Sequence, residues 1–436
     1  MIELKGKFAD AHIFADIVDE DTYSQIIKVI NNPVAKDSYL AIMADCHAGA
    51  GCVIGTTMQI KDRVCPNLVG VDIGCGMLTV KLGKLNFDEE DFKRFDDACH
   101  NVPSGFCIYK QIPEELWTDV KDPKGYLKKL HCFNNLKEID RLENSMGTLG
   151  GGNHFTELDI DDEGNYYLVI HSGSRNLGKQ VCEYYQKIAL RSTYDHKKEI
   201  DTLIKQLKEE GKEKDIEKSI KALRESFPTV IDDLAFLEGD DMQDYIDDLK
   251  ICQDFAHRNR KAIAYNILMN FFELNKISKW DKLTFKYGGK KTNKYLNDKG
   301  KLEAFETIHN YIDLENMILR KGAVSAQKGE TLLIPINMRD GSMICVGKGN
   351  PDFNYSAPHG AGRIMSRRAA KDSINLDDYV NSMKGIHSST VNSSTIDEAP
   401  FAYKPISSII ENTKETVDII KIIKPIYNFK ASDVTD

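Results

Sequence analysis

The segment 356–368, Ser-Ala-Pro-His-Gly-Ala-Gly-Arg-Ile-Met-Ser-Arg-Arg, contains the residue best suited to covalent chemistry. His359 stands on a tight turn between a proline and a glycine, and Arg363, Arg367 and Arg368 follow it. An accessible imidazole beside backbone amides and guanidinium groups suits a nucleophile that attacks phosphorus, because amides and arginines can hold the phosphoryl oxygens. A Gly-rich turn with an incidental histidine is the alternative, and this segment alone does not decide between them.

Four other loops carry side chains that can bind a metal. They supply one carboxylate, one thiol and three imidazoles: Asp72, Cys75, His154, His171 and His309. Any one of these patterns is weak evidence, but three histidines in or beside such turns are harder to assign to chance. The mixed ligand set suits a borderline divalent metal, or two metals that share a bridging thiolate. Zinc is the usual partner of cysteine and histidine, and the spacing alone does not exclude it.

Two glycine-rich turns suit phosphate binding. Residues 147–157 read Gly-Thr-Leu-Gly-Gly-Gly-Asn-His-Phe-Thr-Glu, and the backbone amides of such a run can cradle a phosphate. A second turn, 171–178, carries Arg175. A paired-metal site would fit phosphoryl chemistry, since one ion can orient a nucleophile while the other neutralises the leaving group.

The elements that position these residues follow from hydrophobic patterning. Apolar runs predict strands at 41–43, 53–60, 77–82, 166–170, 331–334 and 419–429. Helical spacing predicts a helix at 21–31, helices within 88–145 (amphipathic at 126–142) and long helices across 183–276. His257 lies on that last helical pattern and is interpreted as structural rather than as a ligand. The lysine-rich residues 282–301 predict a solvated hairpin.

No internal repeat or low-complexity linker interrupts the 436 residues, which favours one domain over 1–436 with a helical insertion at 183–276. The net charge of −9 argues against a uniformly basic nucleic-acid binder but allows a local basic groove. No apolar run approaches a transmembrane span, and the N-terminus lacks the layout of a signal peptide. Ten scattered cysteines indicate a reducing, cytoplasmic environment.

The same motifs resemble those of the RtcB-type RNA-splicing ligases, over nearly the whole chain except the 190s to 250s. Val71-Asp72-Ile73-Gly74-Cys75-Gly76 is similar to the Asp-x-x-Cys metal motif of that family, and residues 147–157 to its Gly-rich Asn-His-Phe-x-Glu motif. The other histidine segments, 171–178, 309–310 and 359–363, resemble its remaining signatures. The resemblance implies an α+β fold of the RtcB type, with β-sheets around a central dinuclear metal cleft and helices outside.

The resemblance also implies an activity. The expected enzyme is a GTP- and manganese-dependent RNA ligase that joins a 2′,3′-cyclic phosphate or 3′-phosphate to a 5′-hydroxyl through a histidine–GMP intermediate, in RNA repair or tRNA splicing. Its implied nucleophile is His359, with Asp45 orienting the imidazole and Arg175 assisting phosphate binding. The sequence does not decide whether the enzyme needs an activating partner of the archease type.

Two residue sets carry the implied cofactors. Two manganese ions would be held by Asp72, Cys75, His154, His171 and His309, with Cys75 as the bridge. The implied GTP and GMP pocket comprises Asn153, His154, Phe155, Thr156, Glu157, His309, Asn310, Pro335, Ile336, Asn337, Met338, Ser342, His359, Gly360, Ala361, Gly362 and Lys430.

The chain departs from the family pattern at a few positions. Gly74 replaces an expected asparagine, Ile336-Asn337 stands where Gly-Ser is common, and Cys46 stands where valine is common. Two other classes of protein stay open on the sequence. One is a metal-dependent phosphodiesterase or phosphatase that acts on RNA ends without guanylylation, and the other is a non-catalytic RNA-binding protein. The complete ligand set argues against the second.

Overall fold

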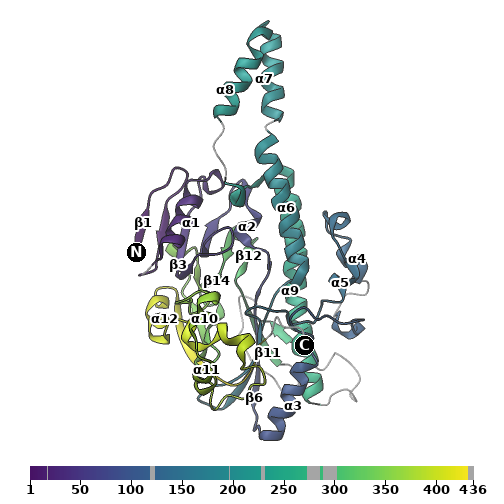
Figure 1. Ribbon diagram of the computed structural model, residues 1–436, viewed down its shortest axis with the longest axis vertical. Helices are drawn as coiled ribbons and strands as arrows, with labels where there is room; N and C mark the ends of the chain where they lie inside the picture. The colour runs from purple at the N-terminus through teal and green to yellow at the C-terminus, as the bar shows by residue number, and fades with distance from the viewer. Residues whose placement is uncertain are drawn as a thin grey trace.

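Two β-sheets form the framework of the computed structural model (Figure 1), which describes residues 1–16, 18–117, 123–195, 197–226, 231–272, 285–287 and 302–430. The first sheet has six strands in the order β1-β2-β3-β4-β13-β12. Their bounds are Ile2–Leu4, Ala11–Ile13, Leu40–His47, Ile54–Gln59, Ile318–Lys321 and Asn310–Asp313, in that spatial order.

The second sheet has eight strands in the order β10-β11-β6-β8-β7-β18-β16-β15. Their bounds are Phe285–Tyr287, Leu302–Ile308, Gly76–Lys84, Asn165–Ser172, Phe155–Ile160, Val417–Lys430, Gly341–Gly347 and Thr331–Asn337. Two short antiparallel pairs complete the strands: β14 (Ala323–Ser325) with β17 (Ser356–Pro358), and β5 (Arg63–Val64) with β9 (Leu237–Glu238). All eight residues of β8 are buried, as its apolar run predicts for a central strand.

The helices lie outside the sheets, with α3 at the foot of the view and α10 to α12 over the lower left (Figure 1). Their bounds are α1 Glu20–Ile30, α2 Pro66–Val69, α3 Glu89–His100, α4 Pro123–Leu127, α5 Ile139–Glu143, α6 Arg175–Asp195, α7 Lys197–Glu209, α8 Ile216–Ser226, α9 Gly239–Phe271, α10 Arg367–Ser373, α11 Leu376–Ser382 and α12 Ile406–Thr413. No described helix has the length and apolar character needed to cross a membrane.

The region expected as a helical insertion divides into two parts. Helices α7 and α8 form an arm that projects from the top of the molecule (Figure 1). By contrast, α9 is a 33-residue helix that packs against α3, α6 and β8 and buries 17 side chains. The helical pattern therefore includes both a projecting arm and one of the main supports of the second sheet.

Most predicted elements are confirmed, with one clear error. The helix predicted at 21–31 is α1, whose first turn is capped by the Asp19 side chain accepting from the Thr22 amide. The strands predicted at 41–43, 53–60, 77–82, 166–170, 331–334 and 419–429 are β3, β4, β6, β8, β15 and β18. The amphipathic helix predicted at 126–142 is wrong, because the range holds the end of α4, a short 3₁₀ helix at Phe133–Asn135 and the start of α5, joined by turns. The buried Asp248 of α9 accepts from the backbone amides of His131 and Cys132 and holds the first of these turns. The hairpin predicted at 282–301 lies outside the described residues, apart from β10.

Candidate active site

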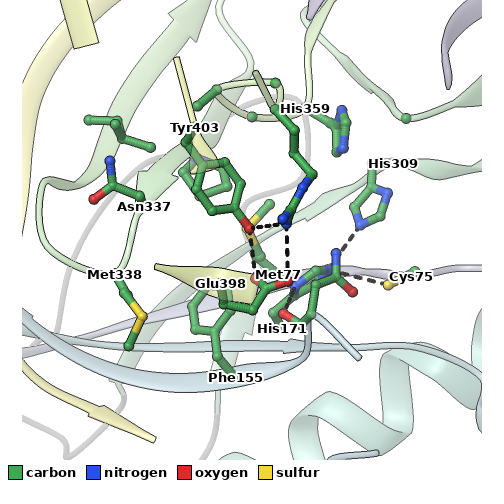
Figure 2. A pocket seen from close by; sticks show the side chains of 18 of the residues that line it. Cys75, Met77, Phe155, His171, His309, Asn337, Met338, His359, Glu398 and Tyr403 are labelled. Atoms are coloured by element: carbon green, nitrogen blue, oxygen red, sulfur yellow. Dashed lines mark hydrogen bonds and ion pairs between the residues drawn. The ribbon is translucent and has the colours of Figure 1, made fainter. Parts of the chain in front are cut away.

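A cavity of about 350 Å³ lies where loops from both sheets meet, a volume within the range of about 300–1,000 Å³ of small-molecule sites. Figure 2 shows side chains from both sheets and from the loops between them pointing into it. Its lining includes most of the residues expected for metal and GTP: Asp72, Cys75, Asn153, Phe155, Glu157, His171, His309, Asn310, Pro335, Ile336, Asn337, Met338, His359, Gly360, Ala361, Gly362 and Lys430. Segments far apart in the sequence therefore contribute to one site.

His359 lies directly after β17, with 21% of its side chain exposed. Its Nδ1 is 2.7 Å from Oδ2 of Asp45, a β3 residue that is only 3% exposed. The same carboxylate oxygen accepts from the backbone amides of His359 and Gly360 at 3.1 and 3.3 Å. Burial alone would lower the pKa of His359, but the charge of Asp45 and its hydrogen bond raise it. The Asp45 carboxylate therefore faces Nδ1, which makes Nε2 the candidate nucleophilic atom.

The turn around His359 requires glycine in the neighbouring loop. Gly322 has a φ of +61°, and a Cβ there would come within 3.3 Å of the His359 ring. Gly362, at φ +71°, packs against Asp45 in the same way. These glycines let the backbone approach the imidazole and its carboxylate closely.

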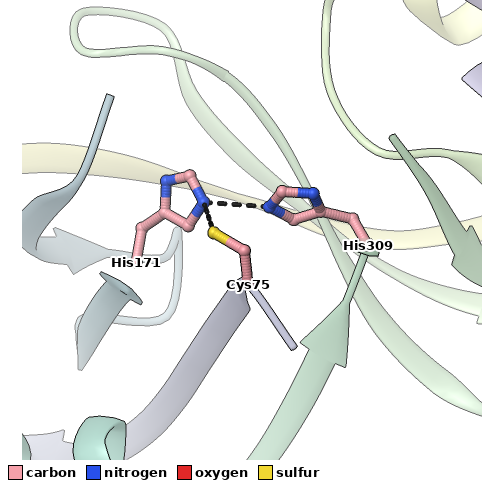
Figure 3. Close-up of side chains that lie close together, drawn as sticks. All are labelled: Cys75, His171 and His309. Carbon is pink, nitrogen blue, oxygen red and sulfur yellow. Dashed lines mark hydrogen bonds between the residues drawn. The ribbon is translucent and has the colours of Figure 1, made fainter. Parts of the chain in front are cut away.

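Five side chains form two groups that could each hold a metal ion and that share one sulfur. One group is Cys75, His171 and His309 (Figure 3), and the other is Asp72, Cys75 and His154. The Cys75 Sγ lies 3.3 Å from Nε2 of His171 and 3.5 Å from Nε2 of His154. His171 and His309 face each other with 3.0 Å between their Nε2 atoms. His154 Nε2 is 3.1 Å from the Asp72 carboxylate.

The chemistry of these donors suits a metal. The Nδ1 atoms of His154 and His171 face the carbonyl oxygens of Leu149 and Asn153, which leaves each Nε2 toward the shared sulfur. Burial lowers the pKa of His309 to about 3 and that of His171 well below its usual value, so both imidazoles are neutral and can ligate. Burial and the adjacent Asp72 raise the pKa of Cys75, so without a metal the thiol keeps its proton. Ligation would displace that proton.

Helix α9 supports the ligand loops from behind. Asn259 is fully buried, and its Oδ1 accepts from the amides of Gly147 and Thr148 while its Nδ2 donates to the carbonyl of Gly173. Arg260, also fully buried, donates to the carbonyls of Gly74 and Ser172. These two residues tie together three of the loops that carry the ligands. Both residues lie on the helix that the sequence predicted around His257, but no local motif distinguished them. His257 itself pairs with Glu306, which agrees with its interpretation as structural.

We expect Asn259→Asp to weaken metal binding, although Asn259 is not itself one of the candidate ligands. The substitution keeps the size and the accepting oxygen but removes the donor to Gly173, so the loops lose part of their alignment. Supporting residues of this kind are worth about 10–100-fold in metal affinity. Metal content after dialysis and the thermal melt measure the effect. Asn270→Asp, on the same helix, is the matched control, because within the described part of the chain the side chain of Asn270 donates to Asn266 and not to a loop of the site. Equal metal retention by both variants would contradict the role of Asn259.

At the other end of the cavity, the residues Arg363, Arg367 and Lys430 meet a carboxylate that the sequence did not single out. Glu398, 3% exposed, pairs with Lys430 at 3.0 Å and with Arg367 at 3.1 Å, and the Tyr403 hydroxyl donates to it at 2.7 Å. Although burial opposes ionisation, the charge of Lys430 lowers the pKa of Glu398 to about 2. Arg363 also reaches Glu398, at 3.3 Å. Glu398 lies in no recognisable motif, so only the fold could place it here.

Lys430 ends β18 and lies inside the cavity rather than on a frayed tail. Its Nζ is 4.9 Å from the centre of the Phe155 ring, and 7% of its side chain is exposed. Asn428, on the same strand, donates from Nδ2 to Glu157 at 2.8 Å. The strand predicted at 419–429 is part of β18, which pairs with β7 and β16 and so holds Lys430 in place.

Several predicted site residues lie beside the cavity instead of lining it. Asp45 stands behind His359, and His154 behind the sulfur of Cys75. Thr156 and Ser342 are buried within β7 and β16. Arg175 has a φ of +58° and donates to the Thr148 hydroxyl and the Gly105 carbonyl, so in this structure it braces the Gly-rich loop.

The structure explains two of the departures from the family pattern. Gly74 has a φ of +74°, and a Cβ there would approach Ala256 of α9 to 2.9 Å, so a side chain would collide with the helix. Ile336 is 2% exposed and belongs to the apolar cluster beneath β15. Asn337 donates to Asp340 and shapes the β15–β16 turn. Nothing in the structure explains the choice of Cys46.

Comparison with known proteins agrees with this arrangement. The chain is 27% identical to the RNA-splicing ligase RtcB of Escherichia coli K12, with 94% of each chain covered. It is 26% identical to the tRNA-splicing ligase RtcB of Aeropyrum pernix, over 86% of this chain and 83% of the relative. It is also 26% identical to RNA-splicing ligase RtcB homolog 1 of Entamoeba dispar, over 96% of this chain and 86% of that protein. A sequence profile described as tRNA-splicing ligase RtcB matches residues 25–431. On that match, across nearly its whole length, the chain belongs to the RtcB family of tRNA-splicing ligases.

Proposed function

We propose that this chain is a GTP- and manganese-dependent RNA ligase. It joins an RNA 3′-phosphate or 2′,3′-cyclic phosphate end to a 5′-hydroxyl end through a covalent His359–GMP intermediate. The observation that carries the proposal is the meeting of two components in one cavity. A histidine held by a buried carboxylate faces the same space as two ligand groups that share the Cys75 sulfur.

The guanylylation step follows from the position of His359. Asp45 holds Nδ1, so Nε2 can attack the α-phosphorus of GTP; a P–N bond forms and the bond to pyrophosphate breaks. The charge that develops on the imidazole is balanced by the Asp45 carboxylate at 2.7 Å. An oxygen of the RNA 3′-phosphate then attacks the same phosphorus and the P–N bond breaks, which returns the neutral histidine. The 5′-hydroxyl finally attacks the activated 3′-phosphate, loses its proton and releases GMP.

The two ligand groups would hold two manganese ions, which supply Lewis-acid stabilisation of phosphoryl oxygens when bound. Asp72, Cys75, His154, His171 and His309 would be their ligands. Guanine would bind at the opposite end of the cavity, near Phe155, Glu157 and Lys430. The carboxylate of Glu157, which lines the cavity, is a natural acceptor for the N–H groups of guanine.

We propose a single domain, with α7 and α8 as a projecting arm, and RNA as the only macromolecular substrate. All ten cysteines are free thiols, and nine of them are buried. That pattern supports a reducing compartment, which for this enzyme would be the cytoplasm.

The ends that are joined test the proposal. An RNA pair with a 3′-phosphate and a 5′-hydroxyl should be sealed in the presence of GTP and manganese, because the chemistry activates the 3′ end. A pair with a 3′-hydroxyl and a 5′-phosphate should not be sealed. Gel analysis of end-labelled RNA measures both. Sealing only the second pair would reject the proposed function, and removal of the 3′-phosphate without GTP would favour a phosphatase instead.

A further inference from the structure

Three carboxyl groups stand in a row on one face of β7 and the turn that follows it. Residues Glu157, Asp159 and Asp161 alternate with residues of the opposite face, as the period of a strand requires. Glu157 lines the cavity, whereas Asp159 lies behind it and is fully buried. Phe155 of the same face packs with Leu333, Ile344 and Ile423, so apolar side chains cover this surface.

The two outer carboxyl groups of the row have partners. Asp161 pairs with Lys421 at 2.8 Å and accepts from the Tyr167 hydroxyl at 2.9 Å. Glu157 accepts from Asn428 at 2.8 Å and lies in the field of Lys430, which is itself paired with Glu398.

Asp159 has no such partner. Neither of its carboxyl oxygens receives a hydrogen bond from a donor in the described part of the chain. On the adjacent β8 its register partner is Tyr167, whose hydroxyl donates to Asp161 instead; on β18 it is Pro425, which has no N–H. Lys81 of β6 lies over the Tyr167 ring, 5.9 Å from its centre. Among the described residues, the group that can share a hydrogen bond with Asp159 is therefore Glu157, two residues away on the same face of β7.

An isolated charge at a fully buried position would be very unfavourable, and two adjacent carboxylates would also repel. We propose that Asp159 is a positioning residue for base recognition: it holds one proton, donates it in a hydrogen bond to Glu157, and keeps Glu157 as the charged acceptor for guanine. This inference rests on the proposed function, because it assumes that guanine binds at Glu157.

The shared proton makes guanine recognition depend on pH. Burial raises the pKa of Glu157 to about 7, and burial together with Glu157 raises that of Asp159 well above its usual value. Below about pH 7 a second proton enters the pair, and Glu157 can then no longer accept from both N–H groups of guanine. The charged fraction of a carboxyl group falls about tenfold for each pH unit below its pKa. Preference for guanine should therefore fall in acid.

The test compares GMP with AMP in the presence of EDTA, by calorimetry between about pH 5 and pH 8.5. Both nucleotides carry the same phosphate, so the ratio of their affinities cancels titration near His359. In the unmodified protein the GMP preference should decline by roughly fivefold between pH 7 and pH 6. In Asp159→Asn, whose amide still donates to Glu157, the midpoint should stay within about half a pH unit of that of the unmodified protein. In Asp159→Leu, which has no donor, the midpoint should move toward alkaline pH by about one unit or more. Asp162→Asn, an exposed neighbour in the following turn, should leave the midpoint unchanged.

Each result has a defined meaning. A preference in the unmodified protein that persists to about pH 5, or an Asp159→Leu midpoint equal to that of the unmodified protein, would overturn the shared proton. If Asp159→Leu does not fold, Asp159→Val removes the same donor and provides the same comparison. Glu157→Gln separates this inference from the proposed function: retention of the GMP preference in that variant would place guanine elsewhere and reject the pocket itself.

Stability gives a second readout. A carboxyl group with a raised pKa in the folded state contributes stability at pH values below its unfolded pKa, and that contribution is lost as the pH rises toward the folded value. Between about pH 4 and pH 8 the melting temperature of the unmodified protein should therefore fall relative to that of Asp159→Asn. Parallel melting curves would contradict a shared proton.

Discussion

Replacing His359 with alanine should abolish covalent labelling of the protein by radioactive GTP and reduce RNA sealing by on the order of 10⁴-fold or more. The reason is that the Nε2 atom is the only part of the residue that enters the proposed reaction, and no other group in the described cavity combines a free imidazole nitrogen with a buried carboxylate. A phosphoramidate is acid-labile and alkali-stable, so the label on the unmodified protein should be lost in acid and kept in alkali.

The fold of that variant should survive. His359 is partly exposed, and its loss removes one contact with Asp45 while the carboxylate keeps the amides of His359 and Gly360. A thermal melt close to that of the unmodified protein checks this. His131 lies on an exposed turn and does not line the cavity, so His131→Ala should be labelled by GTP as the unmodified protein is. Retained acid-labile GMP on His359→Ala would move the nucleophile to another residue.

Replacing Cys75 with serine should remove most of the bound metal and silence both guanylylation and sealing. The sulfur belongs to both ligand groups, so a single substitution weakens both sites. A serine hydroxyl is poorly deprotonated at neutral pH and is a harder, weaker ligand than thiolate. Metal content measured by atomic emission should fall from two ions per chain toward zero, and added manganese should restore activity only at much higher concentration.

A buried thiol outside the cavity provides the matched control. Cys345 of β16 is fully buried and outside the described ligand groups, so Cys345→Ser should keep its metal. Treatment of the unmodified enzyme with EDTA should mimic Cys75→Ser, and returning manganese should reverse it. If Cys75→Ser retained two ions per chain, the sulfur would not bridge them, whether or not the variant is active.

Residue chemistry was enough to single out five side chains that the structure gathers into two overlapping candidate ligand groups. Each motif alone was weak evidence, but cysteine, histidine and aspartate recurred beside glycine turns in several loops. Their role as metal ligands stays a prediction. Apolar strands such as β8 were equally visible, because continuous burial leaves a continuous apolar run.

Other parts of the site left no local signal. Glu398 lies in an ordinary sequence, and it reaches the cavity only because the 3₁₀ turn 393–398 packs beneath Lys430. Asn259 acts through five hydrogen bonds to loops over 80 residues away, which helical periodicity does not encode. The helix predicted at 126–142 fails for a different reason. Its apolar spacing is present, but hydrogen bonds from the backbone of the following turn to Asp248 end the helix early.

The place of β18 in the sheet has a consequence for synthesis. This strand lies between β7 and β16, and no strand that comes before it in the chain joins those two. It also brings Asn428 and Lys430 to the end of the cavity that we propose binds guanine. On a translating ribosome, a chain that has emerged only as far as α12 already contains His359 and all five candidate ligands, but its sheet is open and the proposed guanine pocket is incomplete. Competence to react with GTP should therefore arise late, as a single event when residues 417–430 leave the exit tunnel, and partly made chains should not consume nucleotide.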